Sequence, residues 1–182
     1  DSIGVGLAAL LSGCDKYYAF DTVKHWNVKK NLQIFDELIS LFKSRTAIPD
    51  NTDVPRVHPE LDNYNFPYDL ITDSKLSDSL NENRISIIKK EICNLGSSAN
   101  RHLFFHPPLS ISEMNTKYSV DFIYSQAVLE HIDDLENTYK AMRKLLKPSG
   151  FMSHDIDFKS HGTSKSWNGH WTFNNLEWKI VR

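Results

Sequence analysis

The chain has few cysteines, no long apolar run and no excess of charge of either sign. Two of its 182 residues are cysteine, Cys14 and Cys93, which are too few for a disulfide scaffold and do not have the spacing of metal ligands. The longest apolar run is the short VGLAALL near the start, far below the roughly 20 residues that span a bilayer. The formal net charge is -2, so no basic surface points to nucleic acid.

These absences predict a cytoplasmic protein with reduced thiols and with neither a membrane nor a nucleic acid as partner. The chain opens with an acidic residue and lacks a basic segment there, which is not typical of a secretory signal. Hydrophobic residues make up 40% and charged residues 24%, as in ordinary globular domains. Six of the eight histidines follow residue 100, and three of the four tryptophans follow residue 166. Residues that can form a site are therefore concentrated in the C-terminal half.

Hydrophobic spacing predicts helices and strands that alternate along the chain. Expected helices cover the opening DSIGVGLAALLSG and residues 28–44, 78–94 and 133–147, and expected strands cover 16–21, 102–106, 120–126 and 151–158. Residues 46–76 contain four prolines and form a long irregular connection, which is usually functional. This order predicts one α/β domain over residues 1–182 with a Rossmann-like, doubly wound, mostly parallel sheet. Residues 28–76 are expected to be a helical and loop insertion or lid within it.

The first candidate site residue is Asp21, which ends the predicted strand KYYAFD. Open α/β sheets bind ligands at the carboxyl ends of their strands. A carboxylate there can accept hydrogen bonds from both hydroxyls of a ribose. The alternative is a helix cap or an ordinary surface acid.

The second candidate is the stretch SVDFIYSQAVLEHIDDLENTYKAMRKLLKPSG, residues 119–150. Ser125 and Gln126 end a predicted strand, and His131 lies in the turn before the next helix. This stretch resembles the class I S-adenosylmethionine-dependent methyltransferases, whose fourth strand and following helix typically read D-x-I-x-S-x-x-x-L-E-H-I-x-D and then L-K-P-G-G. It differs at Ser149, where the family usually has glycine.

The resemblance implies S-adenosyl-L-methionine as cofactor and methyl transfer to an oxygen or nitrogen of a small-molecule or glycan acceptor. It implies cofactor contacts from Ser2, Asp21, Pro108, Leu109, Ser125 and Gln126. Asp21 would hold the ribose and Ser125 and Gln126 would face the methionine end, with His131 near the transferred methyl group. The family's first strand and its last strands have no counterpart in the sequence, so the domain is expected to be truncated at both ends. The tail over residues 152–182 also resembles bacterial methyltransferases of glycan and cell-surface polysaccharide pathways.

The third candidate is the run SHDIDFKSHGTSKSWNGHWTF, residues 153–173, with three histidines, two aspartates and two tryptophans. Strand alternation places His154 on one face and Asp155 and Asp157 on the other. His161 and His170 lie nine residues apart, which is not a recognised ligand spacing. No bound metal is therefore expected. In the structural interpretation, the histidines cap turns while Trp171 and Trp178 pack on the sheet.

The catalytic hypothesis follows from the chemistry of a sulfonium donor, which needs little activation, so the enzyme mainly aligns the acceptor. A base with a pKa near neutral would take the proton of a hydroxyl or amine acceptor. The catalytic candidates are His131, His154, His161 and His170, with Asp157 or Asp155 orienting one of them. Trp167 and Trp171 suit a sugar or another ring as acceptor.

Three other functions stay open at this point. A Rossmann dehydrogenase would need G-x-G-x-x-G after its first strand and a catalytic Tyr/Lys pair or equivalent, and neither is found in the sequence. A non-catalytic methyltransferase-like binding domain is the second alternative. A metal-dependent hydrolase that uses the His/Asp run over residues 154–170 is the third.

Overall fold

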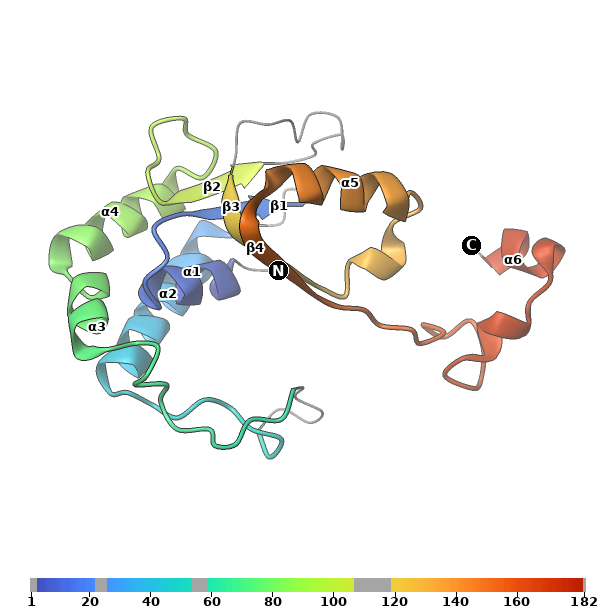
Figure 1. Ribbon diagram of the computed structural model, residues 1–182, viewed down its shortest axis with the longest axis horizontal. Helices are drawn as coiled ribbons and strands as arrows, with labels where there is room; N and C mark the ends of the chain where they lie inside the picture. The colour runs from blue at the N-terminus through green and yellow to red at the C-terminus, as the bar shows by residue number, and fades with distance from the viewer. Residues whose placement is uncertain (1–2, 22–25, 54–58, 107–118, 182) are drawn as a thin grey trace. The chain divides into compact units, whose positions relative to one another are not determined.

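The computed structural model describes residues 3–21, 26–53, 59–106 and 119–181 (Figure 1). It consists of two compact units, residues 1–109 and 110–182. Ser2, Pro108 and Leu109, which the sequence predicts to contact a cofactor, lie outside the described residues. The expectation of one domain over residues 1–182 stays a prediction.

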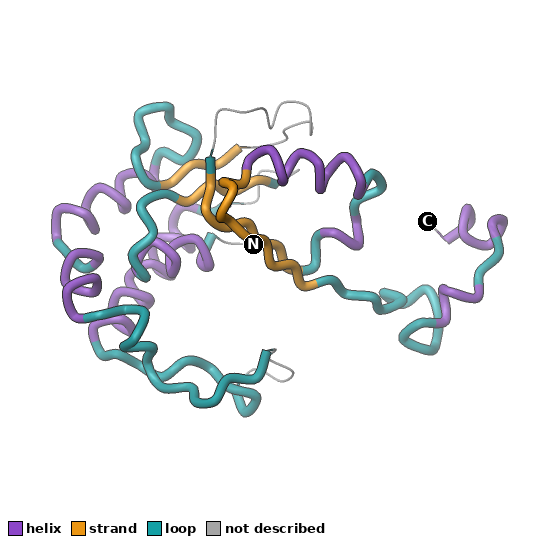
Figure 2. The backbone as a smooth tube through the Cα atoms, viewed as in Figure 1, coloured by secondary structure: helices purple, strands orange, loops and turns teal. Residues whose placement is uncertain are grey.

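The first unit combines helices with a pair of parallel strands (Figure 2). The elements are α1 (Gly4–Leu11), β1 (Tyr17–Phe20), α2 (Val28–Lys43), α3 (Asp73–Ser79), α4 (Glu82–Cys93) and β2 (Leu103–His106). The register runs from Tyr17 opposite Leu103 to Phe20 opposite His106. Because parallel neighbours cannot be joined by a tight turn, the chain crosses over through α2, α3 and α4 between the two strands.

Polar caps set the starts of the helices. The Asn27 side chain accepts the Lys30 N–H at 2.9 Å and begins α2. Asn81 accepts the backbone N–H groups of Asn83 and Arg84 and begins α4. Asparagine is a preferred N-cap because its side chain satisfies donors that the first turn leaves free. The helix expected over 78–94 corresponds to α4, which begins later because Asn81 is its N-cap. The separate helix α3 was not predicted, and it begins within the connection expected to be irregular over residues 46–76.

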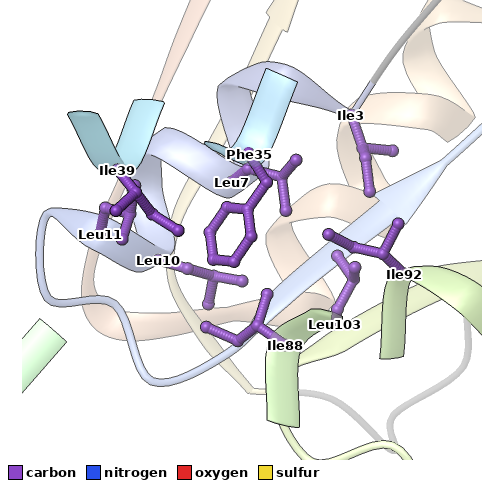
Figure 3. Packing of buried hydrophobic residues seen from close by; sticks show 9 residues of the cluster. All are labelled: Ile3, Leu7, Leu10, Leu11, Phe35, Ile39, Ile88, Ile92 and Leu103. Carbon is purple, nitrogen blue, oxygen red and sulfur yellow. The ribbon is translucent and has the colours of Figure 1, made fainter. Parts of the chain in front are cut away.

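The core of the first unit lies between α1, α2, α4 and the start of β2. Figure 3 shows the Phe35 ring surrounded by aliphatic side chains from the other elements. The cluster consists of Ile3, Leu7, Leu10, Leu11, Phe35, Ile39, Ile88, Ile92 and Leu103. Burying each such side chain stabilises the fold by about 1.5–3 kcal/mol. A Cβ on Gly6 would lie 2.2 Å from the Tyr17 ring, so only glycine lets α1 approach β1 this closely.

A buried carboxylate joins α4 to β2. Glu91 is 5% exposed, and its oxygens accept the backbone N–H groups of Arg101, His102 and Leu103 at 2.7, 3.0 and 2.8 Å. These three donors lie just before and at the start of β2. The carboxylate therefore fixes the point at which the strand enters the sheet.

The long connection after α2 has a small apolar cluster of its own. Phe66, Ile71 and Leu76 are buried together, with Phe42 of α2 packed against them. The Phe42 and Phe66 rings meet edge to face at 6.1 Å. Since α2 also contributes Phe35 to the main core, the first part of residues 28–76 belongs to the packed interior. A lid role for the remainder stays a prediction.

The second unit is built around another parallel strand pair. Its elements are β3 (Val120–Gln126), η1 (Leu129–His131), α5 (Leu135–Leu145), β4 (Leu146–Asp155), η2 (Gly169–Thr172) and α6 (Asn175–Val181). The sequence did not predict η2 and α6. The register pairs Phe122 with Phe151 and Ser125 with His154. Asp134 caps α5 by accepting the N–H of Asn137 at 3.1 Å.

The boundary between α5 and β4 differs from the expectation. The helix ends at Leu145 instead of residue 147, and the strand covers Leu146–Asp155 instead of 151–158. The register shifts between Val120 and Phe122, so Pro148 falls in an irregular part of the ladder where its missing N–H is tolerated. A Cβ on Gly150 would lie 2.8 Å from the Asp121 carbonyl oxygen, so the two backbones approach closely there.

One face of the β3–β4 pair is covered by a helix, and the opposite face is exposed. Tyr139 of α5 places its ring edge-on to His154 at 5.7 Å, so α5 lies on the face that carries His154 and Ser125. The opposite face carries Phe122 and Phe151, whose rings are 5.1 Å apart and exposed. Alternating helices and parallel strands confirm the α/β class, while the doubly wound sheet stays a prediction. None of the described helices is both long and apolar enough to cross a membrane.

Candidate functional site

Asp21 lies at the carboxyl end of β1, directly after Phe20, and its side chain is exposed. It belongs to the first unit, whereas Ser125, Gln126 and the predicted catalytic residues belong to the second. A carboxylate at the end of a parallel strand has the position and the acceptor oxygens that a ribose diol requires. This is the position that the sequence predicts for it.

The ends of β3 and β4 bring Ser125 and His154 together. Their Oγ and Nδ1 atoms are 2.8 Å apart, although the residues are 29 positions apart in sequence. The ring is half-buried, and its Nε2 is covered and has no hydrogen-bond partner within the described part of the chain. Burial lowers the pKa of His154 below its ordinary value of 6.5. At neutral pH the ring is therefore uncharged, and its hydrogen bond with the Ser125 hydroxyl links the ends of β3 and β4.

We expect the His154 ring to titrate below pH 6.5 in the folded protein, while the unfolded chain titrates near that value. Between the two values the unfolded chain binds more protons, so stability is full above pH 6.5 and falls as the pH is lowered through this window. Histidine-ring NMR against pH measures the shift directly. The His154→Gln variant, which cannot titrate, should lose this part of the pH dependence of unfolding. A His154 ring that titrates at or above pH 6.5 contradicts the prediction.

The backbone turns sharply after β3. Ala127 has a φ of 49°, in the left-handed region that non-glycine residues rarely adopt. Its N–H donates to the Asp155 carbonyl oxygen at 2.9 Å, which holds the turn against the end of β4. Gln126 consequently lies at this edge, exposed and opposite Asp155. An alanine carries no sequence signal for such a turn.

Three of the predicted catalytic residues gather after the end of β4. His161 Nε2 lies 3.6 Å from Asp157 Oδ2, and the His131 and His161 rings meet edge to face at 5.6 Å. Glu130 Oε1 accepts the Asp157 N–H at 3.4 Å, which draws the segment after β4 toward η1. The Lys159 N–H donates to Asp157 and lowers the pKa of that carboxyl below its usual range. Asp157 is therefore ionised beside His161 at neutral pH.

His161 has an unusual backbone conformation. Its φ is 48°, and the following Gly162 has a φ of 85°. Left-handed conformations at non-glycine residues are strained and cluster at functional sites. The two consecutive left-handed residues turn the chain so that the His161 ring comes back to Asp157, four positions earlier.

The same segment forms a pocket of about 340 Å³, which we call the loop pocket. Its walls include Asp157, Lys159, His161, Lys165, Ser166 and Trp167. The two lysines were not among the predicted site residues, and their spacing in the sequence carried no signal for a site. A larger hollow of about 660 Å³ lies between α2 and α4 in the first unit, and no predicted site residue lines it.

His170 lies among aromatic rings. It stacks with Trp178 at 6.2 Å and meets Trp171 at 6.1 Å, and its Nδ1 is covered without a partner among the described residues. Trp171 and Trp178, which were expected to pack on the sheet, are exposed and contact the His170 ring. Within the described ranges, no group of three or more His, Cys, Asp or Glu side chains is arranged to hold a metal ion.

Part of the chain is similar to a known protein family. Residues 108–153 match the family model of a methyltransferase domain. The described part of this match, residues 119–153, contains β3, η1, α5 and most of β4. Searches of curated proteins and of solved structures give no match. Members of this family use S-adenosyl-L-methionine as methyl donor, and the match indicates that residues 108–153 are similar to part of a class I S-adenosylmethionine-dependent methyltransferase domain.

Proposed function

We propose that the protein transfers a methyl group from S-adenosyl-L-methionine to a hydroxyl or amine of a small-molecule or glycan acceptor. The observation that carries this proposal is the methyltransferase-domain match over residues 108–153. It falls on β3 and β4, whose parallel pairing puts Ser125, Gln126 and His154 at one edge. Ligands of open parallel sheets bind at this edge.

We also propose that the sheet is doubly wound. Both described strand pairs are parallel, and parallel sheets are normally covered by helices on both faces. Within its own unit, the β3–β4 pair has α5 on one face and exposed Phe122 and Phe151 on the other. An aromatic face of this kind is the surface that a second layer would cover.

The described residues have the chemistry that the cofactor requires. Asp21 offers acceptor oxygens for the ribose hydroxyls, and Gln126 offers both an amide donor and an acceptor for the amino-acid end. Ser125 offers a hydroxyl held by His154. When bound, the cofactor supplies a methyl group already activated on a sulfonium. The protein's own task is then to align the acceptor and to take its proton.

His161 is the best-supported base among the predicted histidines. Its side chain is 48% exposed, lines the loop pocket and lies 3.6 Å from the ionised Asp157 carboxylate. A carboxylate beside a histidine stabilises the imidazolium that forms when the ring takes a proton. The covered Nε2 of His154 instead suits a positioning role, in which the ring holds Ser125.

Calorimetric titration of the full chain with S-adenosylmethionine, its demethylated product and NAD tests the cofactor class. We expect saturable binding of the first two and none of NAD. Binding of NAD without binding of S-adenosylmethionine would overturn the proposed function in favour of a dehydrogenase. Binding of the methyl donor with no transfer to any acceptor would favour the non-catalytic binding domain.

Asp21→Asn is expected to weaken S-adenosylmethionine binding by about 10- to 100-fold, because a hydrogen bond to a charged group contributes about 1.5–3 kcal/mol. Titration calorimetry of the variant gives the change in Kd. Asp15→Asn is the matched control, since it makes the same charge change at the other end of β1. Equal Kd values for Asp21→Asn and the unchanged protein would remove Asp21 from the cofactor site.

A further inference from the structure

The loop pocket has a fixed wall. Ser160 is buried, and its N–H donates to the Trp167 carbonyl oxygen at 2.6 Å. The Thr163 hydroxyl donates to the Ser160 carbonyl oxygen, also at 2.6 Å. A Cβ on Gly169 would lie 2.4 Å from Ser164 Oγ, so the returning chain packs closely on the loop. These contacts hold the Trp167 backbone at the pocket.

The pocket keeps a positive charge that no carboxylate balances. Two lysines and one aspartate line it. Asp157 is engaged with Lys159, through the backbone N–H at 2.9 Å and through Nζ at 3.7 Å. Lys165 forms no ion pair within the described parts of the chain. A concave polar surface with one free ammonium attracts an anion.

An aromatic ring lies beside this charge. Trp167 is 59% exposed and meets the Trp171 ring edge to face at 5.4 Å. An indole has only two side-chain torsions, so it offers a large, flat apolar contact area at a low cost in side-chain entropy. The volume of about 340 Å³ lies at the low end of ligand pockets, which range over roughly 300–1,000 Å³. It therefore suits a ligand with one ring.

We propose that the loop pocket binds an acidic sugar, with Trp167 against the sugar ring and Lys165 on its anionic group. His161 and Ser166 line the same pocket and can hydrogen-bond the sugar hydroxyls. Identifying this sugar as the methyl acceptor rests on the proposed function, because His161 is then next to the hydroxyl that loses its proton. The binding itself does not depend on methyl transfer. A carboxylate and a phosphate supply the same anionic chemistry, and the test distinguishes them.

The test is a titration of the full chain, without methyl donor, with glucuronate, glucose 6-phosphate, glucose and inorganic phosphate. The Trp167 indole N–H signal in NMR spectra reports occupancy. We expect saturable shifts with at least one acidic sugar, and weaker binding of glucose and of phosphate alone. Lys165→Gln should weaken binding of the acidic sugar by about 5- to 10-fold, as expected for one partly exposed charge-assisted contact. Lys144→Gln, which makes the same charge change on α5, should leave it unchanged.

The relative strength of the two acidic sugars decides between carboxylate and phosphate. The proposal is overturned if neither acidic sugar binds saturably, if glucose binds as tightly as they do, or if Lys165→Gln loses no affinity. Inorganic phosphate that binds as tightly as glucose 6-phosphate would also overturn it, because the ring would then contribute nothing. Trp167→Phe keeps a smaller ring and should bind more weakly, while Trp167→Ala should lose most binding; titration calorimetry measures both variants, which lack the indole N–H signal. A negative result in the sugar titration does not affect the titration with S-adenosylmethionine, so the proposed function is tested separately.

Discussion

Replacing Glu91 with alanine is expected to lower the free energy of unfolding of the first unit by about 3–5 kcal/mol, because a buried donor left without a partner costs about 1–3 kcal/mol. Three backbone N–H groups, those of Arg101, His102 and Leu103, lose their acceptor in this variant. The loss is a large share of the 5–15 kcal/mol that stabilises a typical domain. The start of β2 should therefore detach from α4 before the rest of the unit unfolds.

Urea unfolding followed by circular dichroism gives the change in stability, and hydrogen exchange of the amides at residues 101–103 locates it. Glu37→Ala is the matched control, because Glu37 is an exposed helix carboxylate that accepts only from the Gln33 side chain in the hydrogen bonds described. It should change stability by less than about 0.5 kcal/mol, as surface substitutions usually do. Glu91→Gln keeps one acceptor oxygen and should cost less than alanine. A Glu91→Ala protein within about 1 kcal/mol of the unchanged chain would contradict the role given to this carboxylate.

Local pattern was sufficient to predict most elements of the fold. The apolar spacing of α2 and the acidic and basic ends of α5 predict these helices, because burial of one face and the caps act over a few residues. The short strands β1 and β2 are likewise visible as short runs rich in apolar and aromatic residues. The predicted boundaries of helices and strands are wrong where a local feature overrides the hydrophobic spacing. Asn81 caps α4, so that helix begins later than predicted, and the irregular ladder near Gly150 lets β4 continue through Pro148.

The site was predictable only to the level of strand ends. Asp21 follows the last residue of β1, and Ser125 and Gln126 end β3, as the sequence predicts. Open parallel sheets bind ligands at such carboxyl ends, and the role of these residues in cofactor binding stays a prediction. The Ser125–His154 contact needs the register of β3 against β4, which no local pattern carries. The approach of His161 to Asp157 needs a left-handed residue at position 161, where the sequence has histidine and not glycine. Glu91 is a further case, since a carboxylate in a helix is normally a solvent-exposed residue.

His161→Asn is expected to lower kcat for methyl transfer by about 100- to 10,000-fold, which is the usual contribution of a positioned general base. Asparagine tolerates the left-handed backbone that this position requires, so the loop should keep its shape. It cannot take a proton at neutral pH. The acceptor KM should change much less than kcat, because the interaction that is lost forms mainly in the transition state. Steady-state kinetics with the acceptor identified by the binding experiments measures both constants.

Asp157→Asn keeps the shape of the partner but removes the charge 3.6 Å from His161, so it should lower kcat by a smaller factor than His161→Asn. His170→Asn is the control histidine, because its ring is packed against Trp178 and it should keep most activity. His154→Gln separates positioning from base catalysis, since it should weaken S-adenosylmethionine binding through Ser125 while the acidic limb of the pH–rate profile persists. If His154→Gln abolishes that limb and His161→Asn does not, the base is His154 and the assignment to His161 is wrong.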